Sequence, residues 1–180
     1  MEWIYNPEET WFTADPHFWH QNVIKYCKRP FKNQKHMNAE IIKNYQQVGE
    51  SHTLIILGDL TMVNDSNRIE HLIRQIPGNK ILVVGNHDRL KPKAYVNIGF
   101  ESVHSSLIMY NRKNPDKDIL CVHDPALAVV WPRDKYVFHG HVHELWKIQR
   151  NLINVAVDVW DFKPVLFSTL LQLIGEEDAK

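Results

Sequence analysis

The feature that most constrains this fold is a series of short apolar runs alternating with longer amphipathic segments. The runs are WFTAD (11–15), TLIILGD (53–59), KILVVGN (80–86), ESVHSSLIMY (101–110), DILCVHD (118–124), KYVFHG (135–140) and INVAVDVW (153–160). Several are almost wholly apolar, which is typical of strands buried on both faces. Between them, four segments carry apolar residues at helical spacing: 20–27, 38–48, 66–76 and 168–178. This alternation predicts an α/β fold.

The boundaries of these elements follow from capping and turn residues. Asn38 and Ser66 are the expected N-caps of their helices, and Gly49 is the expected stop after segment 38–48. The polar segment 111–117 is expected to form the turn of a hairpin that joins 101–110 to 118–124.

Length and charge limit the classes of protein to consider. The chain has 180 residues, so we expect a single domain over residues 1–180. Because 21 basic side chains balance 21 acidic ones, we expect no membrane partner and no stable nucleic-acid complex. The two cysteines form no CxxC pair, the first residues show no signal peptide, and no apolar run could span a membrane. These features predict a cytoplasmic protein and leave the oligomeric state open.

Side chains that can bind metal stand at the ends of the apolar runs. In chain order they are Asp15, Asp59, Asn86, His123, and the pair His141 and His143. In open α/β sheets, sites form beyond the carboxyl ends of strands. Five segments of the chain could therefore deliver these side chains to one edge.

The motifs around these residues point to a known family. They read Asp15-Pro16-His17, Gly58-Asp59, Gly85-Asn86-His87-Asp88, His123 and Gly140-His141-Val142-His143. The set resembles the D-x-H, G-D, G-N-H-D/E, H and G-H-x-H motifs of the calcineurin-like metallophosphoesterase superfamily, and FTADPHFWHQNVIKYCKRPF looks like its compact bacterial and phage members. The resemblance implies two facing mixed β-sheets flanked by helices, a four-layer α-β-β-α sandwich with a two-metal site at one edge.

The resemblance also implies how the ligands are shared. One divalent ion would take Asp15, His17, Asp59 and His143, and the other would take Asp59, Asn86, His123 and His141, with Asp59 bridging. Carboxylate, amide and imidazole donors without a thiolate suit Mn, our preferred metal, and also Fe, Ni, Co or Zn. We expect Gly140 to help the backbone turn so that the two histidines after it reach different ions. His139 lies outside the family pattern and is expected to be structural or to support the ligands.

The implied reaction is hydrolysis of a small phosphate ester, with a phosphodiester such as a nucleotide derivative preferred. A hydroxide bridging the two ions would attack phosphorus. His87 would protonate the leaving oxygen as general acid. Asp88 could orient the His87 imidazole, with an N-cap or salt-bridge role as the alternative. The alternative functions are a phosphomonoesterase and a non-catalytic metal-binding scaffold of the same fold; such scaffolds typically lack the acid histidine or some ligands.

Contacts to the substrate are expected from the segment that follows His17. His20 and Asn22 are the candidates closest to the metals in sequence, and Arg29 could hold a phosphate. The alternative for this segment is a solvated amphipathic helix and loop. Two further residues receive structural interpretations: Cys121 as a small buried apolar residue, and Asp158 as a helix cap or strand-edge partner.

Overall fold

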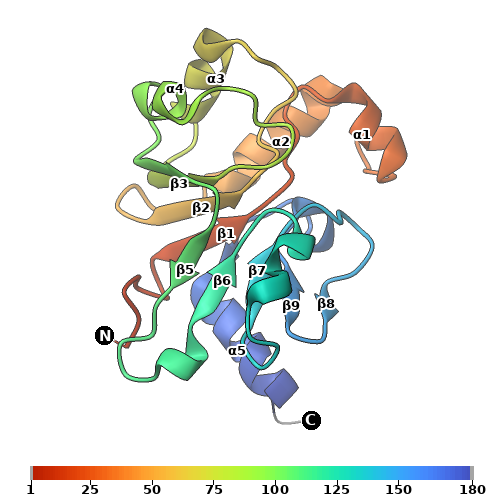
Figure 1. Cartoon of the computed structure of the whole chain (residues 1–180). Helices are drawn as coiled ribbons and strands as arrows, with labels where there is room; N and C mark the ends of the chain where they lie inside the picture. The colour runs from red at the N-terminus through yellow and green to blue at the C-terminus, as the bar shows by residue number, and fades with distance from the viewer. Residues whose placement is uncertain (1, 179–180) are drawn as a thin grey trace.

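The computed structural model describes residues 2–178, which form two five-stranded mixed sheets with helices packed around them (Figure 1). The first sheet has the order β10-β1-β2-β3-β4 and consists of β10 (Val165–Leu166), β1 (Thr10–Thr13), β2 (Thr53–Leu57), β3 (Asn79–Val83) and β4 (Ser102–His104). The second has the order β5-β6-β7-β9-β8 and consists of β5 (Leu107–Met109), β6 (Ile119–Cys121), β7 (Val137–His139), β9 (Leu152–Asn154) and β8 (Ile148–Gln149). In each sheet the inner strands run parallel, and antiparallel strands lie at the edges: β10 in the first sheet, and β5 and β8 in the second.

The two sheets pack face to face through a shared apolar core. Side chains of β1 and β2 such as Phe12, Ile55 and Leu57 point inward and meet residues of the second sheet such as Phe138. The Phe12 and Phe138 rings pack edge to face with their centroids 5.1 Å apart. Alternate residues of the same strands point the other way, because successive side chains in a strand leave opposite faces.

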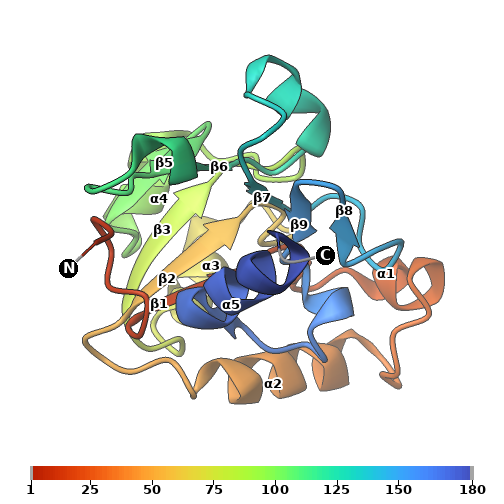
Figure 2. The ribbon, with the colours of Figure 1, turned by 90° about the horizontal axis from the view of Figure 1, so that it is seen from below.

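Helices cover the outer face of the first sheet. They are α1 (Gln21–Tyr26), α2 (Gln34–Tyr45), α3 (Ser66–Ile73) and α4 (Pro92–Asn97). Leu54, Ile56 and Leu82 point out of the sheet into the core that these helices bury, where Ile41 and Ile69 are fully buried. The helix α5 (Phe167–Asp178) lies across the end of the sandwich where the two termini lie (Figures 1 and 2).

The outer face of the second sheet is covered differently. Leu120, Val122 and Val137 pack against Ala128 and Trp131, which belong to the 3₁₀ helix η2 (Pro125–Val130) and the residue after it. This segment projects from β6 and β7 (Figure 2). The expected pair of facing mixed sheets is therefore present, with α-helices over the outer face of the first sheet and a 3₁₀ segment over the second. None of the helices within residues 2–178 has the length and apolar character needed to cross a membrane.

Two expected strands are wrong in part. The run 101–110 is split into β4 and β5, which belong to different sheets, so the chain crosses between sheets at the polar pair Ser105-Ser106. The run 153–160 stops being a strand at Asn154 and continues as the 3₁₀ helix η3 (Val157–Val159). The side chain of Asn154 causes this change, because its Oδ1 accepts a hydrogen bond from the Ala156 N–H and draws the backbone into a turn.

Of the other expectations about local structure, one is confirmed and the cap assignments are wrong. The hairpin joining β5 and β6 is confirmed, with the 3₁₀ helix η1 (Pro115–Lys117) in its turn. The short elements α4, β8 and β10 were not expected. The cap assignments are wrong: Asn33 and Asp65, rather than Asn38 and Ser66, cap α2 and α3 through their side chains. The C-cap of α2 is Gln46 rather than Gly49.

Candidate metal centre

The seven expected metal ligands come from loops that follow the parallel strands of both sheets. The loops after β1, β2 and β3 carry those of the first sheet, and the loops after β6 and β7 carry those of the second. Because parallel strands end at the same edge, these loops meet at one end of the sandwich. The residues are Asp15, His17, Asp59, Asn86, His123, His141 and His143.

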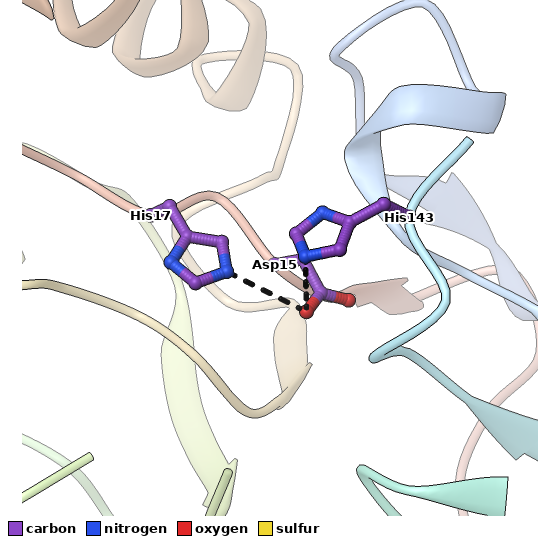
Figure 3. Close-up of side chains that lie close together, drawn as sticks. All are labelled: Asp15, His17 and His143. Carbon is purple, nitrogen blue, oxygen red and sulfur yellow. Dashed lines mark ion pairs between the residues drawn. The ribbon is translucent and has the colours of Figure 1, made fainter. Parts of the chain in front are cut away.

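One group of donor atoms surrounds Asp15. The His17 Nε2 atom lies 3.8 Å from Asp15 Oδ1 and 3.3 Å from Asp59 Oδ2, and His143 Nε2 lies 4.0 Å from Asp15 Oδ1. Figure 3 shows the His17 and His143 rings directed at the same Asp15 oxygen. Asp15 Oδ1 and His17 Nε2 are buried and have no hydrogen-bond partner among the described residues. An unpartnered buried carboxylate oxygen is costly, and a divalent cation at the centre of this group would satisfy it.

A second group of donor atoms lies on the other side of Asp59. The His123 Nε2 atom is 3.5 Å from Asp59 Oδ2 and 3.0 Å from Asn86 Oδ1. His141 Nδ1 is 3.1 Å from the same Asn86 oxygen and 3.3 Å from His123 Nε2. Asp59 Oδ2 therefore borders both groups, which is the position that a bridging carboxylate requires.

In two of the histidines, His123 and His143, a hydrogen bond at Nδ1 leaves Nε2 to face the donor groups. The Nδ1 atom of His123 lies 2.9 Å from the carbonyl oxygen of Leu57, and that of His143 lies 3.2 Å from Asp158 Oδ2. A carbonyl or an ionised carboxylate can only accept a hydrogen bond, so Nδ1 carries the proton in each ring. This leaves Nε2, the atom directed at the donor groups, as the nitrogen available to a metal, and metal-binding histidines usually donate their other N–H in this way.

The backbone is bent at most of these residues. Five of the seven have a left-handed conformation: Asp15 (φ 55°), His17 (49°), Asp59 (54°), His141 (71°) and His143 (51°). Residues other than glycine seldom adopt this region, which costs about 1–3 kcal/mol each when the structure enforces it. Such strain concentrates at functional sites, and here it aims side chains from successive loops at one point.

Three glycines allow these loops to approach closely. A methyl group at Gly58 would collide with the ring of His123, one at Gly85 with the carboxylate of Asp59, and one at Gly140 with the carboxylate of Asp15. The expectation that Gly140 supplies a turn is wrong, because its φ is not left-handed and the bends lie at the two histidines after it. Gly140 provides space instead of conformational freedom.

Burial strongly perturbs the protonation of the first group. Burial raises the pKa of Asp15 to about 8, despite the opposing effect of His143. Burial, together with His143 and Arg29, lowers the pKa of His17 far below its ordinary value. Burial also disfavours the charged form of His143, but hydrogen bonds to Asp158 and Cys27 and the charge of Asp15 raise its pKa to about 10. A cation near Asp15 would stabilise the ionised carboxylate without protonating His17.

The structure places His87 at the rim of both donor groups. Its Nε2 atom is 3.9 Å from Asp59 Oδ2, and its side chain is 32% exposed. Its backbone N–H donates to Asp59 Oδ1 at 2.8 Å, which fixes the loop that carries it. The ring can therefore reach a group bound at the centre from the solvent side.

Asp88 does not orient the His87 ring, which corrects one of the two roles considered for it. Its Oδ2 accepts from the N–H groups of Asp59 (2.8 Å) and Gly85 (2.9 Å), and its Oδ1 accepts from that of Leu60 (3.0 Å). Burial raises its pKa to about 6. Asp88 thus fastens the loop after β2 to the loop after β3 and holds Asp59 in place.

The expected substrate contacts separate into three cases. His20 lies near the centre: its ring is 5.3 Å from that of His17, and its Nδ1 is buried without a partner among the described residues. Asn22 is exposed in α1, and no hydrogen bond within residues 2–178 links it to the donor groups. Arg29 is only 4% exposed and uses its guanidinium inside the protein, so the expectation that it holds a phosphate is wrong.

Two residues beside the centre were not anticipated as parts of it. Asp158 contacts His143 and Arg29 through a side chain that is 2% exposed, so the expected capping or strand-edge role is wrong. Cys27 lies near both His143 and Asp158. A charged residue that interrupts the apolar run INVAVDVW was the available signal for Asp158.

The remaining interpretations of single residues hold. His139 is fully buried, packs 4.7 Å from the Trp146 ring and donates from Nδ1 to the Gly140 carbonyl, so its role is structural. Cys121 is fully buried in the core between the sheets.

Relatives of this chain match it over most of its length. No protein-family profile matches the chain. It is 31% identical over 170 residues to the uncharacterized protein MJ1445 of Methanocaldococcus jannaschii, a match covering 89% of this chain and 88% of that protein. It is 27% identical over 181 residues to the Gene 66 protein of Mycobacterium phage L5, covering 84% and 87% of the two chains. The solved structure of the protein of unknown function AQ665 from Aquifex aeolicus superimposes with a TM-score of 0.71 at 28% identity, covering 91% of this chain and 98% of that one. At this identity and coverage, the chain belongs to the same protein family as MJ1445.

Proposed function

We propose that this protein is a binuclear metal-dependent phosphoesterase with the four-layer fold of the calcineurin-like superfamily. One observation supports this above all: Asp59 Oδ2 lies between two groups of donors, 3.3 Å from His17 Nε2 and 3.5 Å from His123 Nε2. A single carboxylate oxygen shared by two imidazole-containing groups is the arrangement that a pair of bridged ions needs.

The donor set fits divalent ions of intermediate hardness. It consists of two carboxylates, one amide oxygen and four imidazoles, without a thiolate. Such a set suits Mn, which we prefer, as well as Fe, Co, Ni or Zn. When bound, two such ions would supply an activated water and offset the charge of a phosphate ester in its transition state.

The side chains of the protein supply the remaining parts of the reaction. His87 borders Asp59 and is part-exposed, so its Nε2 can donate a proton to a leaving oxygen from the solvent side. Asp88 and Gly85 fix the loop on which His87 stands. His20 adds a second imidazole beside His17, where it could contact the ester.

One carboxylate near the centre favours a phosphodiester over a phosphomonoester. Asp124 Oδ2 lies 3.9 Å from His141 Nε2, and the Asp124 side chain is 36% exposed. It therefore adds negative charge at the rim of the site. A diester carries one negative charge, whereas a monoester carries up to two near neutral pH, so repulsion from Asp124 is weaker for the diester.

The test compares hydrolysis of bis-p-nitrophenyl phosphate and p-nitrophenyl phosphate by the Mn-loaded protein. We expect faster diester hydrolysis, and we expect His87→Ala to lower kcat by about 10²–10⁴-fold while two ions stay bound. The matched control is His71→Ala, because His71 is exposed on α3. Cyclic nucleotides, linear dinucleotides and phosphomonoesters, each assayed with Mn, Ni and Zn, then define the substrate class.

The scaffold alternative predicts a different result. If wild type and His87→Ala bind two ions but share the same trace rate on all substrates, the enzymatic assignment fails. The protein would then be a metal-binding scaffold of the same fold.

A further inference from the structure

Arg29 is a buried cation whose donors are all used inside the protein. Its Nε and Nη2 atoms donate to the two oxygens of Asp158 at 2.7 and 2.8 Å. Nη2 also donates to the Asp15 carbonyl at 2.8 Å, and Nη1 donates to the Pro16 carbonyl (3.1 Å) and to Met37 Sδ (3.4 Å). A guanidinium has five N–H donors, and these contacts account for all of them.

Asp158 lies between this cation and one of the proposed metal ligands. The same Oδ2 that accepts from Arg29 lies 3.2 Å from His143 Nδ1. Both oxygens of Asp158 accept from the guanidinium of Arg29, which does not lose its charge in proteins. The carboxylate is therefore ionised at neutral pH, and it can only accept from the ring.

These three residues connect loops from both sheets. Arg29 follows α1, Asp158 lies in η3 beyond the second sheet, and His143 follows β7. The segment before Asp158 is fastened to the first sheet, because the Val157 N–H donates to the Ala14 carbonyl at 2.9 Å. Arg29 donates to the carbonyl of Asp15, the residue that follows Ala14. The network therefore links one proposed carboxylate ligand, Asp15, to one proposed histidine ligand, His143.

Within residues 2–178, no buried pair of an arginine and a carboxylate supports the second donor group. Its histidine His123 is oriented by the carbonyl of Leu57 at 2.9 Å, which is a neutral partner within the sheet. The carboxylate nearest to the other histidine, Asp124, lies 3.9 Å from His141 Nε2 and is partly exposed. The two groups therefore differ in what holds their ligands.

We infer, on the basis of the proposed two-metal function, that Asp158 and Arg29 are positioning residues of the first metal site alone. Asp158 fixes the tautomer and orientation of His143 so that Nε2 faces Asp15. Arg29 fixes Asp158 and the backbone of Asp15 together. Carboxylates that support a ligating histidine in this way typically change metal affinity by about 10–100-fold.

The test is a Mn titration of the chelator-treated protein by calorimetry, with electron paramagnetic resonance to separate coupled pairs of ions from isolated ones. Asp158→Asn keeps the shape of the side chain but removes its charge. We expect it to weaken one of the two sites about 10–100-fold and leave the other within about threefold. At intermediate Mn the coupled signal should give way to that of an isolated ion.

The matched control is Asp65→Asn, which removes an exposed carboxylate at the start of α3. Asp65 caps α3 by accepting from the N–H groups of Asn67 and Arg68, and asparagine caps equally well. We expect both affinities of Asp65→Asn to stay within about threefold of wild type.

A measurement on the wild type keeps the test independent of variant folding. Nitrogen-15 NMR of the Zn-loaded protein should show His143 protonated at Nδ1. The Nδ1 proton should not exchange with solvent on the millisecond timescale.

Three results would overturn the inference. They are unchanged affinity of both sites in Asp158→Asn, equal loss at both sites, or a His143 ring protonated at Nε2 instead. These outcomes are distinct from failure of the proposed function, which would appear as a wild-type protein that binds no divalent ions or binds two without any hydrolysis.

Discussion

Replacing Gly140 by alanine tests whether the metal centre depends on the close approach of two loops. Alanine can adopt the backbone conformation of Gly140, since its φ is not left-handed. The added methyl group would collide with Asp15 Oδ2 and lie 2.6 Å from Ala14 Cβ and 3.1 Å from the Leu57 carbonyl. Ordinary contacts to a Cβ atom begin at 3.4 Å, so the loop after β1 must move away by about the difference, 0.8 Å.

A movement of this size matters because metal sites tolerate little error. Distances from ligands to metals in proteins hold to about 0.2 Å, so Asp15 would leave the first donor group. We expect Gly140→Ala to weaken the first site at least about tenfold, and overpacking should lower the free energy of unfolding by about 1–3 kcal/mol. The hydrogen bond from the His141 N–H to Asp15 Oδ2, now 2.8 Å, would lengthen as well.

Two assays measure these effects: Mn titration by calorimetry, and urea unfolding with chelator present. Gly175→Ala is the matched control, because a methyl group there meets no atom within 4 Å. Gly175 lies in α5, so alanine should leave metal binding unchanged and raise the free energy of unfolding by up to about 1 kcal/mol. Equal metal affinity and equal stability of the two variants would refute the close-approach argument.

Three further predictions concern metal, charge and pH. Chelation should lower the melting temperature by roughly 5–10 °C for each ion present at 100 times its Kd, and a melting curve that EDTA does not move would contradict the two-metal site. Arg29→Lys should lower the free energy of unfolding, measured in urea, by about 2–4 kcal/mol, because lysine leaves buried acceptors unpaired. In the control Arg74→Lys, where Arg74 forms an exposed pair with Glu70, the free energy of unfolding should change by less than about 0.5 kcal/mol. Burial lowers the pKa of His139 to about 4, so the unfolded chain takes up a proton below about pH 6.5 that the folded protein excludes. His139 should therefore contribute a fall of about 3 kcal/mol in the stability of the chelator-treated protein as pH drops from about 6.5 to 4. His139→Phe should lose this part of the pH dependence, and an unchanged slope would show that His139 does not contribute it.

The sequence predicted the parts of the site that depend on local pattern. Apolar runs identified most strands, and a polar residue at the end of each parallel strand marks where the chain leaves the core. Since parallel strands end at one edge, Asp15, Asp59 and His123 could be brought together from their positions in the chain alone. A structural role was one of the two expected for His139, and its place in the buried strand β7 accounts for that role.

Hydrogen bonds and ion pairs between segments far apart in the chain could not be predicted from local sequence patterns. Arg29 and Asp158 are separated by 129 residues. From its own neighbourhood, Arg29 was expected to hold a phosphate and Asp158 to cap a helix or pair at a strand edge. Asp88 lies beside His87 in sequence, yet its carboxylate is directed at the backbone of another loop.

The sequence by itself determined the alternation of strands and helices and the chemistry of the proposed ligands, because burial and strand ends leave a local periodic signal. The tertiary structure decided how those ligands are held. It split the run 101–110 between two sheets and turned the run after Asn154 into a 3₁₀ helix. It also made the absence of a side chain at Gly140 necessary for two loops to approach closely. These outcomes depend on which atoms meet across the two sheets, and packing between segments far apart in the chain has no local sequence pattern.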